Sequence, residues 1–388
     1  MEASGLDRIV RAEDVAHMGI TEVIRHMPYI YGEYRRLVAA IRKRRPDVAI
    51  LIDFPDVNFR LARELKKLNI PVIYFVSPQL WAWKRRRLRW VQQRVSRMMV
   101  IFPFEEKFYR SRGVDADYVG HPLAELPKPT ISRQDYATLH GLDPSKQWIA
   151  ILPGSRWKEI TANLDGMIEL AHHLPSGFEF ILPVAATISR DKLATHIAGN
   201  DEWWPAKPES DLNCLNIYLV PDARDALHHA RASVIASGTA TVQAAVIGNP
   251  FVVVYRVSPL TFYLARHLVH YPPDIWPEAW NSPTPNQSRE IGLVTHPDPY
   301  PDPDGNLPIA MPNLIAGRRI VPELLQANFN PDALAAHLEP LLEDTPTRAR
   351  QIADLAEVRG QLIPDPAADP ITRAAQIVLE LLKRPPQS

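Results

Sequence analysis

Two carboxylates, Asp53 and Asp56, follow an apolar run at residues 48–52 that is typical of a buried strand. In open parallel sheets, ligands bind beyond the carboxyl ends of the strands, and a carboxylate there can take a proton from a hydroxyl as a general base. An equally good interpretation is that Asp56 or Asn58 caps the helix predicted over residues 58–67. Spacing alone does not distinguish Asp53 from Asp56 as the base.

Two turns of small residues could hold phosphate. The first, Gly154 and Ser155 followed by Arg156, comes directly after the apolar run at residues 148–152. The second, Ser237-Gly238-Thr239, follows the run at residues 233–236. Such turns bring backbone N–H groups and the positive end of a helix close to an anion, and an arginine can form a forked contact with phosphate. Either turn alone could be mere packing, but the pair predicts a diphosphate site.

A basic segment follows two tryptophans. Trp81 and Trp83 precede Arg85, Arg86 and Arg87, and further arginines follow in the chain. The simplest interpretation is a solvated basic helix. Basic and aromatic side chains together also suit an anionic membrane surface, where each cation contributes ~1 kcal/mol. Nucleic acid is the weaker option, because Lys plus Arg and Asp plus Glu both number 44 and the formal net charge is zero.

Composition narrows the class of protein. The 388 residues are 46% hydrophobic, which is enough to bury a core. The single cysteine, Cys214, excludes an intramolecular disulfide framework and a multi-cysteine zinc site, and no other metal-ligand spacing is present. No apolar run approaches the ~18 residues of a membrane span, and the first residues do not resemble a signal peptide. We expect a cytoplasmic protein.

Apolar runs alternate with helical patterns along the chain, which predicts parallel sheets in an α/β fold. Two series of runs imply two Rossmann-like domains facing across a cleft, at residues 1–130 and 131–345, with C-terminal helices at 346–388 that pack back on the first domain. Prolines gather at residues 272–308, which hold 10 of the 38, and predict an irregular insertion that is either a lid or a loop without function. The runs lie at residues 48–52, 72–76, 98–102, 148–152, 178–182, 217–220, 233–236 and 251–255.

Several stretches, taken in order, resemble the lipid-A-disaccharide synthase family. The likeness extends from about residue 15 to about residue 362, apart from the proline-rich insertion. It rests on residues 75–83 (FVSPQLWAW), 101–105 (IFPFE), 120–122 (GHP), 152–156 (LPGSR), 237–240 (SGTA), 255–256 (YR) and 311–318 (MPNLIAGR).

The resemblance implies a GT-B glycosyltransferase. It would transfer 2,3-diacylglucosamine from UDP-2,3-diacylglucosamine to 2,3-diacylglucosamine 1-phosphate (lipid X) with inversion, giving a β-1,6 disaccharide 1-phosphate and UDP. The family implies no metal or other cofactor, a peripheral position at the inner face of the cytoplasmic membrane, no nucleic acid, and sometimes a homodimer.

The resemblance also assigns roles. Asp56 would be the base for the acceptor 6-hydroxyl, with Asp53 as its rival, and Arg156 would stabilise the departing diphosphate. The donor would lie against the residues of both turns together with Gln243, Arg256 and Asn313. The membrane and acceptor side would carry Trp81, Trp83, Arg85, Arg86 and Arg87.

Three departures from the family pattern carry expectations of their own. About 60 residues that open the family's first domain have no counterpart here, and a misplaced start codon would explain it. Gln243 stands where the family usually has a glutamate, which would weaken donor binding. The insertion at 272–308 is not part of the pattern. The alternatives are another UDP-sugar GT-B enzyme, such as an N-acetylglucosaminyltransferase or epimerase, and a truncated, non-catalytic UDP-binding protein.

Overall fold

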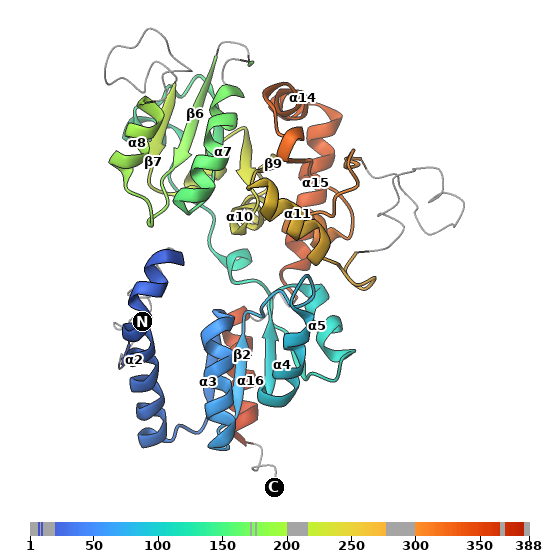
Figure 1. The fold of residues 1–388 in the computed structure, drawn as a ribbon. Helices are drawn as coiled ribbons and strands as arrows, with labels where there is room; N and C mark the ends of the chain where they lie inside the picture. Colours follow the sequence, from blue (N-terminus) through green and yellow to red (C-terminus); the bar gives the residue numbers. More distant parts are fainter. Residues whose placement is uncertain are drawn as a thin grey trace, which may run out of the picture.

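The computed structural model describes residues 7, 9–10, 20–170, 173–174, 177–199, 216–276, 299–364 and 369–383. Two parallel β-sheets organise these residues into two α/β domains (Figure 1). The two domains and the predicted parallel strands are thereby confirmed as a pair of Rossmann-like units. All eight predicted apolar runs form strands, because each alternates with a helix that covers the sheet.

The first sheet has the strand order β1-β2-β3-β4. Its central strands are buried, whereas the edge strand β1 leaves Ile50 and Ile52 about half exposed. The strands are β1 (Ala49–Ile52), β2 (Val72–Phe75), β3 (Arg97–Val100) and β4 (Ala116–Tyr118). The helices of this domain are α2 (Ile20–Arg44), α3 (Pro55–Lys67), η2 (Arg85–Arg87), α4 (Leu88–Arg94) and α5 (Pro103–Arg110). The long helix α2 stands beside α3 at the flank of the domain (Figure 1).

The second sheet has the order β10-β9-β8-β5-β6-β7, in which the chain reverses direction between β5 and β8. Neighbouring strands on either side of such a reversal form the switch point where doubly wound sheets bind ligands. The strands are β5 (Gln147–Leu152), β6 (Phe178–Pro183), β7 (Ile217–Val220), β8 (Ala232–Ala236), β9 (Phe251–Tyr255) and β10 (Glu323–Leu325). The helices are α6 (Arg133–His140), α7 (Trp157–Glu169), α8 (Arg190–Ala198), α9 (Ala223–His229), α10 (Thr239–Ile247), α11 (Pro259–Leu268), α13 (Met311–Ala316), η7 (Gln326–Asn328) and α14 (Pro331–Leu342).

The chain crosses between the domains twice, and the two crossings touch. The first passes through Gly120 and His121 before η3 (Pro122–Glu125), and the second follows α15 (Pro346–Gln361). His121 N–H donates to the Leu362 carbonyl at 3.0 Å. A Cβ on Gly120 would come within 2.8 Å of Pro364 Cδ, so only glycine lets the two crossings approach this closely. Burial lowers the pKa of His121 to about 4, which keeps the ring neutral at the crossing.

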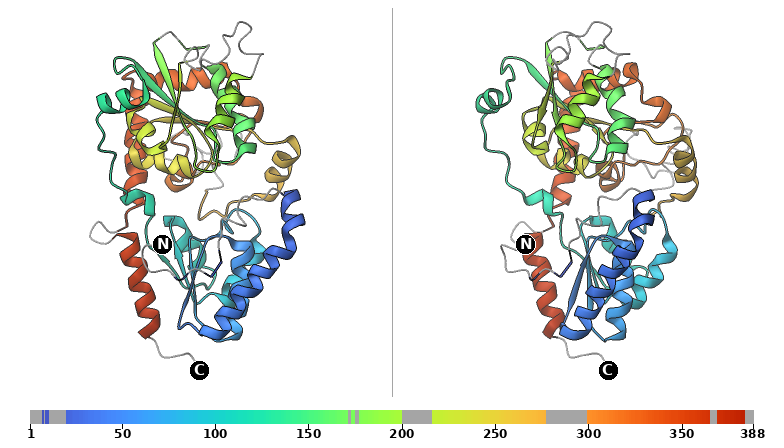
Figure 2. Two further views of the ribbon diagram at one scale, coloured as in Figure 1. Left: turned by 90° about the vertical axis from the view of Figure 1, so that its left-hand side faces the viewer. Right: turned by 60° about the vertical axis from the view of Figure 1, so that its left-hand side comes forward.

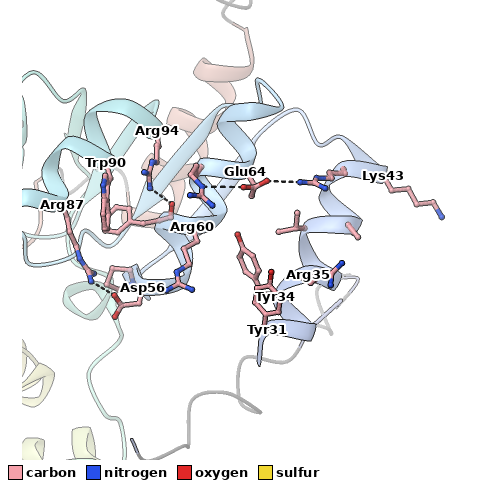
Figure 3. A pocket seen from close by; sticks show the side chains of 16 residues that line it. Tyr31, Tyr34, Arg35, Lys43, Asp56, Arg60, Glu64, Arg87, Trp90 and Arg94 are labelled. Carbon is pink, nitrogen blue, oxygen red and sulfur yellow. Dashed lines mark hydrogen bonds and ion pairs between the residues drawn. The ribbon is translucent and has the colours of Figure 1, made fainter. Parts of the chain in front are cut away.

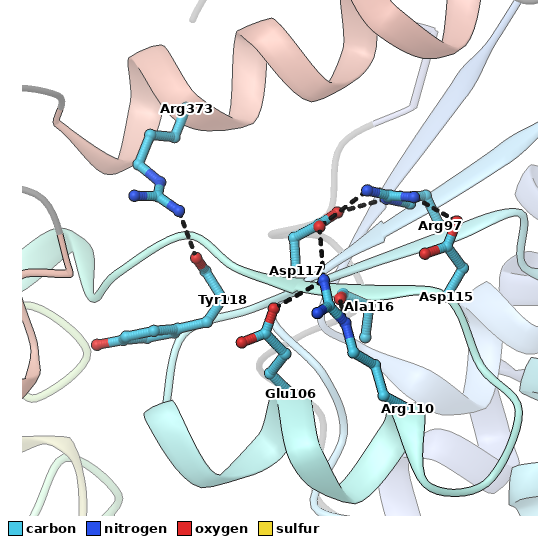
Figure 4. A network of polar contacts seen from close by, with 8 residues as sticks. All are labelled: Arg97, Glu106, Arg110, Asp115, Ala116, Asp117, Tyr118 and Arg373. Carbon is cyan, nitrogen blue, oxygen red and sulfur yellow. Dashed lines mark hydrogen bonds and ion pairs between the residues drawn. The ribbon is translucent and has the colours of Figure 1, made fainter.

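The C-terminal helices divide between the domains. Helix α15 packs against α10 and α13 of the second domain, and α16 (Pro370–Lys383) runs alongside the first (Figure 2). Figure 4 shows where α16 docks: Arg373 donates to the Tyr118 carbonyl at 3.0 Å. Strand β4 is itself held by Arg97, which pairs with Asp115 and Asp117. Among the described residues of the segment 346–388, α16 therefore lies against the first domain, whereas α15 packs on the second and meets the first only at its end, where Gln361 accepts from the Tyr118 hydroxyl.

Sequence reasoning missed several of the described elements, among them β4, β10 and α2. Strands β4 and β10 have three residues each and include a carboxylate, so neither reads as an apolar run. Helix α2 spans 25 residues and contains Pro28, which breaks the helical pattern. The core of the predicted proline-rich insertion, residues 277–298, lies outside the described residues.

Candidate functional site

The two predicted phosphate turns lie side by side in the second domain. Strands β5 and β8 pair in parallel, with Leu152 opposite Ile235, so both strands end at the same edge of the sheet. The turn that begins at Gly154 leaves β5, and the turn that begins at Ser237 leaves β8. The fold thus brings residues more than 80 positions apart to the switch point of one sheet.

The turn after β8 is open at the start of α10. Gly238 and Thr239 are exposed, the helix has no side-chain cap, and its first turn contains no acidic residue. Ser237 Oγ donates to the Ile309 carbonyl at 3.0 Å, which ties the turn to the loop before α13. The N–H groups at a helix start carry partial positive charge and seek an acceptor. This helix end can therefore receive an anion.

The turn after β5 is occupied by a carboxylate of its own helix. Glu159 Oε2 accepts from the Ser155 and Arg156 N–H groups at 3.1 and 3.3 Å. The Arg156 guanidinium, 80% exposed, pairs with Glu159 Oε1 at 2.7 Å. An anion bound at this turn must compete with Glu159, whereas Arg156 is free to swing outward. Sequence reasoning missed Glu159. A glutamate three residues after the cap position is typical of a capping box, but the cap position here is Arg156 and not the usual Ser or Thr, so the sequence does not show the motif.

Gly154 has a backbone that other residues rarely adopt. Its φ is +128°, and a Cβ would lie 2.7 Å from the Cβ of Glu159. Glycine is therefore required for the close packing of this turn on Glu159.

Two other predicted donor residues lie near the same edge. Arg256 follows β9; its N–H donates to Asn163 Oδ1 at 2.8 Å, and its guanidinium donates to the Phe329 carbonyl at 2.6 Å. Gln243 is half-buried in the second turn of α10. Their contacts with a donor stay predictions.

Asn313 is completely buried, and its amide is fully used inside the protein. Its Oδ1 accepts from the Ile320 and Val321 N–H groups at 2.7 and 3.0 Å. Its Nδ2 donates to the Val321 carbonyl at 3.0 Å and to Glu323 at 2.7 Å. Glu323 in turn accepts from Ala310, in the loop tied to Ser237. Asn313 thus shapes the loop beside the β8 turn; the predicted direct donor contact would need the side chain to leave these four bonds.

On the first domain, the predicted carboxylates lie in a strained turn. Asp53 and Phe54 both have left-handed backbones, with φ of 45° and 43°. The Asp53 carbonyl is fixed by Asn58 Nδ2 at 2.6 Å and by the Tyr74 hydroxyl at 2.6 Å. Burial, reinforced by the Asp53 carboxylate, raises the pKa of Tyr74, so this hydroxyl keeps its proton and donates. Strain held by surrounding contacts is common at functional sites.

Asp56 carries an arginine partner. Its Oδ1 lies 2.6 Å from the Arg87 guanidinium, and its side chain is 69% exposed. Helix α3 begins at Pro55 without a side-chain cap, so Asp56 and Asn58 do not have the alternative role of helix cap. The side chain of Asp53 is exposed as well. Both carboxylates are accessible, and Arg87 marks Asp56 as the one with a fixed position.

The predicted membrane-side residues separate into two groups. Trp81 is 1% exposed; its Nε1 donates to the buried Glu105 at 3.0 Å, so this tryptophan belongs to the core and not to the surface. Trp83, Arg85 and Arg86 are exposed. Arg87 faces Asp56, as described above.

An exposed apolar helix adjoins the exposed basic residues. No residue of α11 is buried, and its surface carries Leu260, Tyr263, Leu264 and Leu268. The chain after α11 bonds to the first domain through the His270 N–H, which donates to the Ala82 carbonyl at 3.1 Å, and through Arg85, which donates to the His270 carbonyl. Helix α11 and residues 83–86 therefore form one surface across both domains, termed here the apolar–basic surface.

The described residues contain no cluster of three His, Cys, Asp or Glu side chains that could hold a metal ion. In the same part of the chain, no helix is both long enough and apolar enough to cross a bilayer.

Sequence comparison with known proteins places the chain in a family. The model of the family described as lipid-A-disaccharide synthetase matches residues 1–273. The lipid-A-disaccharide synthase of Acidobacterium capsulatum is 48% identical, over 99% of this chain and 87% of that protein. That of Koribacter versatilis is 44% identical, over 99% of this chain and 89% of that protein. Among solved structures, Anabaena Alr3699/HepE in complex with UDP-glucose matches with a TM-score of 0.49 and 12% identity, over 90% of this chain and 81% of that chain.

Proposed function

Because the chain belongs to the lipid-A-disaccharide synthetase family, we propose that it transfers 2,3-diacylglucosamine from UDP-2,3-diacylglucosamine to 2,3-diacylglucosamine 1-phosphate. Family membership makes it a glycosyltransferase that forms the lipid A disaccharide. The main support for a nucleotide-sugar donor site is the pairing of β5 with β8. This pairing sets the two predicted phosphate turns next to each other at the switch point of the second sheet.

The diphosphate of the donor lies at the start of α10, in this proposal. That helix end is open, whereas Glu159 fills the start of α7. Arg156 then leaves Glu159 and pairs with the diphosphate as negative charge develops on it. A fixed cation and a helix dipole at the leaving group supply the stabilisation that metal ions give in other transferases. We therefore expect turnover to be unchanged when a chelator removes divalent metal ions.

The acceptor lies on the first domain at the Asp53–Asp56 turn. Asp56, the first candidate, takes the proton of the 6-hydroxyl while the oxygen attacks the anomeric carbon of the donor. The bond from that carbon to the diphosphate breaks on the opposite face, and UDP leaves with the electron pair. Arg87, whose guanidinium lies 2.6 Å from Asp56 Oδ1, holds Asp56 in place. Asp53 remains the rival for the same role.

The acyl chains of both substrates require a site that meets a membrane. The apolar–basic surface suits this purpose, because Leu260, Leu264 and Leu268 can enter lipid while Arg85 and Arg86 meet anionic headgroups. We expect the chain to sediment with vesicles that contain phosphatidylglycerol. The double variant Leu260→Ser/Leu264→Ser should stay in the supernatant, whereas equal sedimentation of both proteins would refute this surface.

The choice of donor tests the function itself. The purified chain is incubated with 2,3-diacylglucosamine 1-phosphate and either UDP-2,3-diacylglucosamine or UDP-N-acetylglucosamine, and the products are identified by mass spectrometry. We expect the disaccharide 1-phosphate from the acylated donor alone. A product from the non-acylated donor, or an epimerised sugar nucleotide, would assign the chain to another UDP-sugar reaction.

A homodimer is the remaining proposed partner. Light scattering after gel filtration should then give about twice the chain mass of 43.9 kDa. A mass near that of one chain would reject it.

A further inference from the structure

A cationic groove opens on the first domain between α2, α3 and α4, with a volume of about 980 Å³ (Figure 3). Seven arginine or lysine side chains line it, against two carboxylates, Asp56 and Glu64. Aromatic rings, among them Tyr34 and Trp90, form the rest of its wall. Because Asp56 belongs to the lining, the groove includes the candidate base.

Both carboxylates are already neutralised by arginines or lysines. Asp56 pairs with Arg87 at 2.6 Å. Glu64 pairs with Arg42 at 3.0 Å and with Lys67 at 2.7 Å. Within the described part of the chain, Arg35 and Arg60 line the groove without any ion pair. The groove therefore has positive charge that the protein itself does not balance.

Two of the cations are held rigidly. The Arg87 and Arg94 guanidinium groups both contact the ring of Trp90, 5.6 and 5.2 Å from its centre. Arg94 also donates to the Phe59 carbonyl at 3.0 Å. Burial, and then the nearby positive charge of Arg63, lowers the pKa of Arg94. Cations crowded in fixed positions are stabilised by an anion of matching size.

The position of Arg60 relates this charge to the reaction. Arg60 follows Asp56 by four residues of α3, a rise of about 6 Å along the same helix face. Figure 3 shows Arg60 beside the Asp56–Arg87 pair, facing the groove. In the acceptor sugar, the phosphate is attached to C1 and the 6-hydroxyl arm to C5, the two carbons that flank the ring oxygen. A sugar with its hydroxyl at Asp56 would thus present its phosphate to the neighbouring arginines.

We infer that this groove binds the acceptor, and that Arg60 recognises its 1-phosphate monoester. The inference rests on the proposed function for the identity of the acceptor. In this inference, the groove makes the chain bind a phosphorylated acceptor sugar in preference to an unphosphorylated one.

Equilibrium binding without any donor tests the inference independently of turnover. The full chain is titrated with 2,3-diacylglucosamine 1-phosphate and, separately, with unphosphorylated 2,3-diacylglucosamine, in the same detergent micelles. The variants are Arg60→Gln and, as control, Arg36→Gln, which removes an exposed arginine of α2 outside the groove. Arg60→Lys keeps the charge but not the forked geometry.

We expect the wild-type chain to prefer the phosphorylated lipid by about tenfold or more, since a hydrogen bond to a charged group is worth ~1.5–3 kcal/mol. Arg60→Gln should lose most of this preference, Arg60→Lys should keep part of it, and Arg36→Gln should keep all of it. The inference is overturned if the wild type shows no preference, or if Arg60→Gln retains it. Equal competition by phosphatidylglycerol would also overturn it, because the groove would then be a general anionic-lipid surface. A chain that binds as expected but transfers no sugar would disprove the proposed function and not the groove.

Discussion

Replacing Asp56 by asparagine tests the assignment of the base. The Asp56 carboxylate is 69% exposed, and exposed ion pairs such as the one with Arg87 contribute only about 0–1 kcal/mol. The free energy of unfolding should therefore change by less than about 1 kcal/mol. A general base contributes about 10²- to 10⁴-fold to the rate, so kcat should fall by that factor. UDP affinity should stay unchanged, since the donor lies on the other domain.

The rival residue needs a matched substitution. Asp53 has a φ of 45°, a conformation that asparagine tolerates but alanine adopts only at a cost of about 1–2 kcal/mol. Asp53→Asn therefore removes the charge without straining the turn. Asp47→Asn is the control, because Asp47 is also exposed but precedes β1 at the opposite end of the strand.

The assay is steady-state UDP release together with urea unfolding of each variant. We expect a large loss of kcat in Asp56→Asn, a smaller loss in Asp53→Asn and none in Asp47→Asn. If Asp53→Asn loses activity by 10²-fold or more while Asp56→Asn remains within about tenfold of wild type, the roles are reversed and the reasoning from Arg87 is wrong.

Three further predictions concern buried or tightly packed residues. Asn313→Ala leaves two buried N–H groups without acceptors. It should therefore lower the free energy of unfolding, measured in urea, by about 2–5 kcal/mol. Unchanged stability together with weaker donor binding would instead indicate that Asn313 contacts the donor directly. Gly154→Ala should displace the Glu159 carboxylate and raise the KM for the donor, because the new Cβ would lie 2.8 Å from Glu159 Oε2; a KM equal to that of wild type would contradict this. Burial raises the pKa of Glu105 from 4.5 to about 7, so the folded chain should lose about 3 kcal/mol relative to Glu105→Gln as the pH rises from about 4.5 to about 7. Urea unfolding of both proteins at pH 5 and pH 8 checks this, and parallel pH dependences would exclude it.

The fold was predictable where apolar runs are continuous. Strands β5, β8 and β9 are buried along almost their whole length, so their sequences show no polar alternation. Strand β10 was not predictable, because it has three residues and begins with the half-buried carboxylate Glu323, which accepts a hydrogen bond from Asn313. Local sequence carries no sign of such long-range pairing.

The site was predictable in its parts but not in its connections. Apolar runs that are followed by glycine or aspartate correctly predicted where the two turns of the second domain and the Asp53–Asp56 turn of the first domain lie. The pair of Asp56 with Arg87 joins residues 31 positions apart, which periodicity cannot reveal. Trp81 was placed on the surface because it adjoins basic residues, yet Glu105 supplies a buried partner for its N–H and draws it into the core.

Acceptor-dependent release of UDP tests the central claim most directly. The purified chain is given UDP-2,3-diacylglucosamine in detergent, with and without 2,3-diacylglucosamine 1-phosphate, and UDP is measured over time. The account predicts release only when the acceptor is present, in equal amount to the disaccharide formed. Release at the same rate without acceptor, or no release in either case, would contradict it.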